Sequence, residues 1–148
     1  MEVLSNIFFE EPDGEIYYDI LNSQGKEWLI GSKDIRTAFE IYQPTAIKGK
    51  ILKSFFPCVC RFPFVYSRLH IKKKKLKLQP EIEHILQRTF GNDVSISCFG
   101  GTPCVHQKAV IQIYRNSKIL VRPVPAADAA DARSVRLHAL DCRHEHHC

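Results

Sequence analysis

Two adjacent glycines, Gly100 and Gly101, followed by Thr102, stand between two segments with the alternating pattern of β-strands. A glycine has no Cβ, so the backbone of such a turn can approach phosphate oxygens closely and aim its amide groups at them. Strand connections without any ligand also use glycines, and these residues form neither a full G-x-G-x-x-G nor a Walker loop. A phosphate-binding turn and an ordinary hairpin both remain open.

A run of lysines is the second candidate for chemistry. Its members are Lys72, Lys73, Lys74, Lys75 and Lys77. Such a run can bind nucleic acid or an anionic membrane surface, and upstream aromatic residues such as Phe62 and Phe64 offer stacking surfaces for bases. A charge run is also typical of a solvated face.

Cysteines and histidines suggest metal or thiol chemistry, but their spacing does not support it. The six cysteines include no C-x-x-C pair, and Cys58 and Cys60 are separated by one residue. The last eleven residues, 138–148, crowd several potential ligands without the paired spacing of a zinc site. His106 is near Cys104 in sequence, which says nothing of their geometry. We assign no catalytic residue and no metal site.

Charge is distributed unevenly along the 148 residues, although the net charge is +5. Residues 1–40 contain nine acidic and three basic residues, whereas residues 41–80 contain ten basic and no acidic residues. The acidic head can lie against the basic middle, or the middle can meet a polyanion. The charges do not decide between these alternatives.

The elements that must position these residues follow from their patterns. Residues 16–21 and 27–30 predict a hairpin around the turn-prone 22–25 segment. Ser32 is expected to cap a helix over 33–42, and Thr45 a basic amphipathic helix over 46–56 that ends at Pro57. On that second helix, Ile47, Ile51 and Phe55 form an apolar row, with Leu52 and Phe56 as a neighbouring row. This pattern predicts either an ordinary helix packed on its own core or a membrane-surface or partner helix.

Residues 58–70 show no clean period and are expected to be irregular. A helix is predicted from Pro80 to Phe90, with Ile82, Ile85 and Leu86 at helical spacing and a glycine after its last turn. Strands are predicted over 94–98, 107–114 and 119–121. The fold class is therefore α+β, with a helical leader, a small antiparallel sheet and an irregular tail.

Composition and length favour one globular domain, with 45% hydrophobic and 25% charged residues. We expect a folded unit over 1–121 and a weakly ordered tail over 122–148, where large apolar residues become scarce. No basic segment leads into an apolar one near the N-terminus, and no apolar run has the length of a membrane span. A cytoplasmic protein with free thiols is expected.

The stretch Ser97-Cys98-Phe99-Gly100-Gly101-Thr102-Pro103, followed by His106 to Ile113, resembles the start of the small lobe in kinase-like phosphotransferases of the aminoglycoside and choline kinase type. The likeness covers about residues 1–120. It implies two strands and a small-residue turn that cover a nucleotide, with Gly100, Gly101 and Thr102 near its phosphates. It also implies that intact relatives use ATP and magnesium to phosphorylate a small alcohol or sugar-like acceptor.

The chain departs from that family in its catalytic part. No lysine follows Lys118, whereas a lysine of the third strand contacts phosphate in protein kinases. The family's H-x-D motif is also missing, since His138 and Asp141 are separated by two residues, and no asparagine follows Asn116. We therefore expect a truncated N-terminal portion that is inactive by itself. The alternative is a small basic binding module for nucleic acid or an anionic membrane surface; the oligomeric state is left open.

Overall fold

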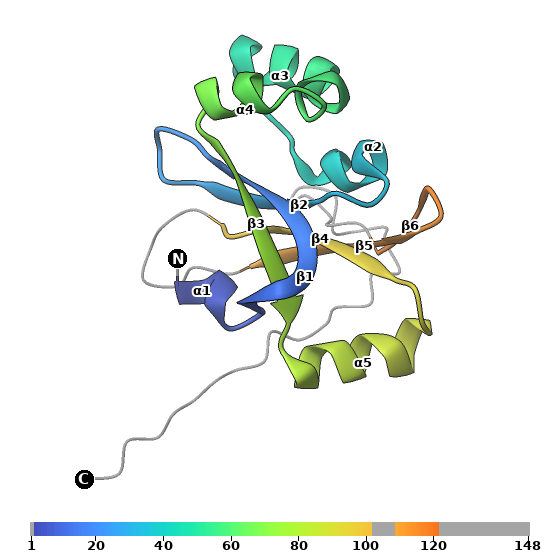
Figure 1. Cartoon of the computed structure of the whole chain (residues 1–148). Coiled ribbons are helices and arrows are strands. Elements are labelled where there is room, and N and C mark those ends of the chain that lie inside the picture. The colour runs from blue at the N-terminus through green and yellow to red at the C-terminus, as the bar shows by residue number, and fades with distance from the viewer. Residues whose placement is uncertain (1, 102–108, 122–148) are drawn as a thin grey trace, which may run out of the picture.

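Six strands form one antiparallel sheet in the order β3-β1-β2-β4-β5-β6 (Figure 1). The computed structural model describes residues 2–101 and 109–121. The strands are β1 (Phe8–Leu21), β2 (Glu27–Gly31), β3 (Ile71–Leu78), β4 (Ser95–Phe99), β5 (Val110–Arg115) and β6 (Lys118–Val121). The helices are α1 (Glu2–Ser5), α2 (Ile35–Ala38), the short 3-10 helix η1 (Phe39–Ile41), α3 (Ile47–Val59), α4 (Pro63–Arg68) and α5 (Pro80–Phe90). The predicted α+β class is confirmed.

The predicted hairpin at the start of the chain is confirmed by the pairing of β1 with β2. The side chain of Asn22 closes its turn, because its Oδ1 accepts hydrogen bonds from the amides of Gln24 and Lys26, each at 2.9 Å. Gly25 supplies the left-handed backbone that the turn needs, with φ +73°.

Strand β1 is longer than the sequence indicates, and a bulge interrupts its pairing with β3. Leu76 is the register partner of both Glu10 and Glu15, so the intervening residues 11–14 are accommodated on β1 without partners in this register. A Cβ on Gly14 would lie 2.7 Å from the carbonyl oxygen of Leu76, so glycine is required there.

The two faces of the sheet carry separate hydrophobic clusters. One cluster joins sheet residues such as Tyr18 and Ile30 to α2, η1 and α3, which belong to the connection from β2 to β3. The other joins Tyr17 and Ile96 to α1 and α5. Because α3 and α4 lie on one side and α5 lies at the opposite end in Figure 1, helices cover both faces of the sheet.

The helix from Pro80 to Phe90 is confirmed as α5. Pro80 occupies its first turn and Gly91 follows it with φ +83°. Leu86 is buried, and Ile82 and Phe90 are partly buried against the same cluster. Ile85, which the sequence pattern groups with them, is exposed, because the apolar face of α5 is narrower than predicted.

The helices between β2 and β3 differ from the prediction. The helix expected over 33–42 is divided into α2 and η1, and its N-cap is Asp34 in a left-handed conformation without a side-chain cap, not Ser32. Likewise, Ala46 and not Thr45 precedes α3. Pro57 lies inside α3 and does not end it, and the supposedly irregular 58–70 segment contains α4.

The expected division into a helical leader and a small sheet is wrong. Three of the six strands, β1, β2 and β3, come from the supposed leader, and β2 pairs with β4 through Trp28 opposite Phe99 and Leu29 opposite Cys98. The two parts therefore form one continuous sheet. The predicted tail over 122–148 lies outside the described residues.

Candidate functional site

The glycine turn begins where β4 ends, as the sequence predicts. The amide of Gly100 donates a hydrogen bond of 2.8 Å to the carbonyl oxygen of Glu27, so Gly100 extends the pairing of β4 with β2 by one residue. A Cβ on Gly100 would lie 3.3 Å from Cδ1 of Leu4, in α1. Gly100 therefore serves strand pairing and the close packing of α1, and its amide already has an acceptor.

Gly101 is the residue at which the backbone leaves the strand. Its φ is +78°, a left-handed conformation that favours glycine, and the residue is buried. Thr102, the third predicted phosphate contact, lies outside the described residues, as do Cys104, His106, Cys142 and Cys148. Within the described part of the turn, a substitution of Gly101 by alanine therefore tests directly whether the turn needs this left-handed backbone.

A buried charge cluster that the sequence analysis missed lies beside this turn. Lys74 Nζ is 2.7 Å from Asp19 Oδ2 and 4.0 Å from Glu27 Oε1. Burial, followed by the charge of Asp19, raises the pKa of Glu27. The carbonyl oxygen of Glu27 also accepts the hydrogen bond from the Gly100 amide. The carboxylates of Asp19 and Glu27 and the ammonium group of Lys74 are therefore linked to the start of the turn through Glu27.

The lysine run lies on β3, at the edge of the sheet. Lys74 is partly buried in the charge cluster, where burial lowers its pKa but the hydrogen bond and charge of Asp19 more than compensate, so the pKa is raised. Lys72, Lys73, Lys75 and Lys77 are exposed. Charged side chains on an edge strand also discourage pairing with another chain.

The acidic head and basic middle lie side by side, because β1 pairs with β3 along much of its length. Lys75 Nζ additionally donates to the carbonyl oxygen of Pro12 at 2.8 Å. On β3, the alternation of a strand places Lys73, Lys75 and Lys77 on one face and Lys72 and Lys74 on the other. The five lysines therefore do not form one uniform surface.

Helix α3 has two rows of apolar side chains, one that faces the sheet and one that is exposed. Its inner row packs on the sheet: Leu52 is partly buried, and Phe56 is fully buried with its ring stacked on Phe39 at a centroid distance of 3.8 Å. The outer row, Ile47, Ile51 and Phe55, is exposed, with Ile47 at 76% and Phe55 at 60%. The helix therefore packs on the protein's own core, as one of the two sequence-based alternatives predicts, but it does so through Leu52 and Phe56 and leaves the other row outside.

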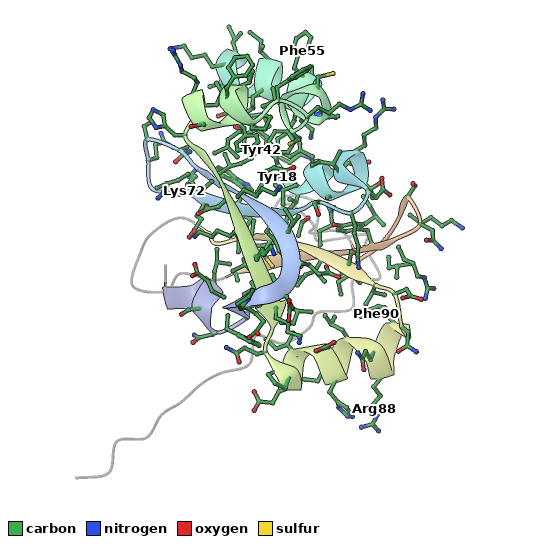
Figure 2. The ribbon with its side chains drawn as sticks, in the orientation of Figure 1. Tyr18, Tyr42, Phe55, Lys72, Arg88 and Phe90 are labelled. Carbon is green, nitrogen blue, oxygen red and sulfur yellow. The ribbon has the colours of Figure 1, made fainter. Side chains whose placement is uncertain are left out.

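Exposed apolar side chains continue from α3 into the next helix. Phe62 and Phe64 at the start of α4 are exposed, Phe64 by 72%, and Leu69 directly follows the helix. We call α3 and α4 together with these flanking residues, 47–70, the α3–α4 cap. Figure 2 shows Phe55 on the outer side of this cap, whereas Tyr18 and Tyr42 lie between the cap and the sheet.

The described cysteines differ sharply in environment. Cys58 is exposed on α3, Cys60 is partly buried, and Cys98 is buried in β4; none of these three forms a disulfide. Burial raises the pKa of Cys60 to about 12, although a hydrogen bond with Tyr18 acts in the opposite direction. Burial likewise raises the pKa of Cys98. Within 2–101 and 109–121, no three His, Cys, Asp or Glu side chains are grouped to hold a metal ion.

Comparison of the chain with family models, curated proteins and solved structures found no match. The helices of the described residues include none that is both long and apolar enough to cross a bilayer.

Proposed function

We propose that this chain is the N-terminal portion of a kinase-like phosphotransferase, and that the connection between β4 and β5 binds nucleotide phosphates. The observation that supports the proposal is the antiparallel pairing of β4 with β5, from Ser95 opposite Tyr114 to Phe99 opposite Val110. Gly100 and Gly101 follow β4 at the start of its connection to β5, and the resemblance expects the phosphate contacts in such a small-residue turn. ATP with magnesium is the ligand assigned by that resemblance.

Within this proposal, Gly101 has the most specific role among the described residues. It has a left-handed backbone at the end of β4, and a glycine without a Cβ lets the backbone approach phosphate oxygens closely. Gly100 supports the turn from inside the sheet, through its hydrogen bond to Glu27. Because the sequence lacks the family's catalytic motif, we expect phosphate binding without phosphoryl transfer.

The test is an NMR titration of the labelled chain with ATP and magnesium. We expect chemical-shift changes concentrated in residues 97–108, and loss of most of them in the Gly101→Ala variant. Gly91→Ala is the matched control, since Gly91 also has a left-handed φ, +83°, but lies at the end of α5. Absence of shifts in the wild type, or equal loss in both variants, would overturn the proposal.

The second candidate is a binding module for nucleic acid. The observation in its favour is the exposure of Lys73, Lys75 and Lys77, which share one face of the edge strand β3. Their replacement by Gln should abolish a salt-dependent affinity for single-stranded DNA, measured by fluorescence anisotropy. Replacement of Lys26, Lys33 and Lys118, three lysines outside β3, is the control with the same change in charge. Equal loss in both variants would identify a general effect of net charge and reject this site.

A further inference from the structure

We infer that the α3–α4 cap docks on an anionic lipid bilayer, with its outer apolar side chains in the interfacial region. This inference is independent of phosphate binding at the glycine turn, because it depends on different residues at a different part of the fold. Six large apolar side chains of the cap are exposed: Ile47, Ile51, Phe55, Phe62, Phe64 and Leu69.

The outer row of α3 takes no part in the packing of the helix on the core. Phe56 and Leu52 already fill the inner side of the helix, and the Phe56 ring lies parallel to that of Phe39 within 5°. Ile47, Ile51 and Phe55 recur every four residues, which gives an apolar stripe about 12 Å long at the rise of an α-helix. Exposed apolar groups in such a contiguous arrangement mark a surface that contacts something else.

Charge identifies the partner. Residues 41–80 contain no aspartate or glutamate, so every charged side chain of the cap itself is basic. Lys48, Lys50, Arg61 and Arg68 are exposed among the apolar groups. An apolar face interspersed with Lys and Arg is the pattern by which peripheral helices bind anionic membranes, and long basic side chains can keep their charges at the headgroups while their stems lie lower.

Other occupants fit these residues less well. A second copy of the chain would bring an equally basic cap against this one, and like charges repel. Nucleic acid would satisfy the basic groups and could stack on Phe55 or Phe64, but the aliphatic side chains of Ile47, Ile51 and Leu69 would gain little from it. A bilayer satisfies both kinds of group.

Co-sedimentation with vesicles tests the inference. We expect the chain to bind vesicles of phosphatidylcholine and phosphatidylserine in equal parts, and to bind pure phosphatidylcholine at least about tenfold more weakly. Phe55→Ser/Phe64→Ser should reduce binding to the mixed vesicles by at least about tenfold. Ile85→Ser/Leu21→Ser, which removes exposed apolar groups outside the cap, should leave it unchanged.

The basic groups need a separate pair of variants. Lys48→Gln/Lys50→Gln should weaken binding, and Arg88→Gln/Lys118→Gln, with the same loss of charge outside the cap, should not. Arg88 lies on α5, at the far end of the molecule from Phe55 (Figure 2). Raising NaCl from about 0.05 M to about 0.5 M should release much of the bound protein.

Several results would overturn membrane docking. Equal binding to both kinds of vesicle, no binding to either, or loss of binding in the lysine variant but not in the phenylalanine variant would each do so. Self-association in sedimentation velocity that disappears in Phe55→Ser/Phe64→Ser, without vesicle binding, would assign the cap to a second copy. Loss of DNA binding in that same variant, again without vesicle binding, would assign it to nucleic acid. The ATP titration is unaffected by all of these outcomes.

Discussion

Lys74 Nζ and Asp19 Oδ2 lie 2.7 Å apart and join the basic strand β3 to the acidic strand β1. The side chain of Asp19 is 9% exposed and that of Lys74 is 24% exposed, so this contact is largely removed from water. This ion pair fixes Lys74 as the lysine of the run that contacts Asp19. Replacing Lys74 should therefore lower the free energy of unfolding more than replacing any other lysine in β3.

Lys74→Met should destabilise the fold by about 2–4 kcal/mol, because it leaves the Asp19 carboxylate buried without its cation. Urea denaturation followed by circular dichroism measures this change. Lys73→Met, on the adjacent exposed position, is the control and should change stability by less than about 0.5 kcal/mol. Similar losses in the two variants would show that the ion pair has no special role.

Glu27→Gln should stabilise the protein at neutral pH, because burial and Asp19 both favour the neutral form of this side chain. A carboxyl group with a raised pKa contributes stability at low pH, and this contribution is lost as the pH rises through the folded-state pKa. The melting temperature of the variant relative to wild type should therefore increase between pH 4.5 and pH 8. A constant difference across that range would contradict the assignment.

Phe56→Ala and its neighbour Phe55→Ala should have very different effects. Phe56 is fully buried and stacked on Phe39, so its truncation should cost about 3–5 kcal/mol. Phe55 is 60% exposed, and its truncation should cost less than about 1 kcal/mol. Thermal denaturation of the two variants distinguishes the inner from the outer row of α3, and comparable losses would mean that the rows are assigned incorrectly.

Cys58 should be alkylated by iodoacetamide at least about tenfold faster than Cys60 at pH 8, as measured by peptide mapping over time. The thiolate is the reactive form, and a pKa of about 12 leaves on the order of one in ten thousand Cys60 thiols ionised at that pH. Cys58 is also exposed, whereas Cys60 is partly buried. In urea, where burial is lost, the two rates should converge. Equal rates in the folded protein would contradict this environment for Cys60.

Local patterns predicted those elements for which the end residues and the periodicity indicate the same structure. Pro80 and Gly91 mark both ends of α5, and the alternation of apolar and polar residues over 94–98 predicts β4, although the structure buries Ser97 as fully as Ile96 and Cys98. The pattern of α3 was ambiguous for a physical reason. Ile47 and Phe56 belong to two different apolar rows of the helix, and periodicity does not reveal which row the rest of the chain covers.

The charge cluster was beyond prediction because it depends on strand register. Asp19, Glu27 and Lys74 come from three strands, and the register of β1 against β3 shifts at a bulge, so no local pattern shows which lysine of the run meets Asp19. The phosphate-binding role of Gly101 and Thr102 stays a prediction. The amide of Gly100 donates its hydrogen bond to Glu27 within the sheet, so Gly100 does not offer this amide to a phosphate.

The pairing between β2 and β4 has a consequence for how the chain is made. Everything needed for the β3-β1-β2 half of the sheet is contained in residues 8–78, whereas β4, β5 and β6 join it through β2. The strands β1, β2 and β3 therefore leave the ribosome before β4, β5 and β6 do, and both β2 and β3 pair with β1. During that interval the outer edge of β2 is open to pairing by any other extended polypeptide, and the arrival of β4 closes it.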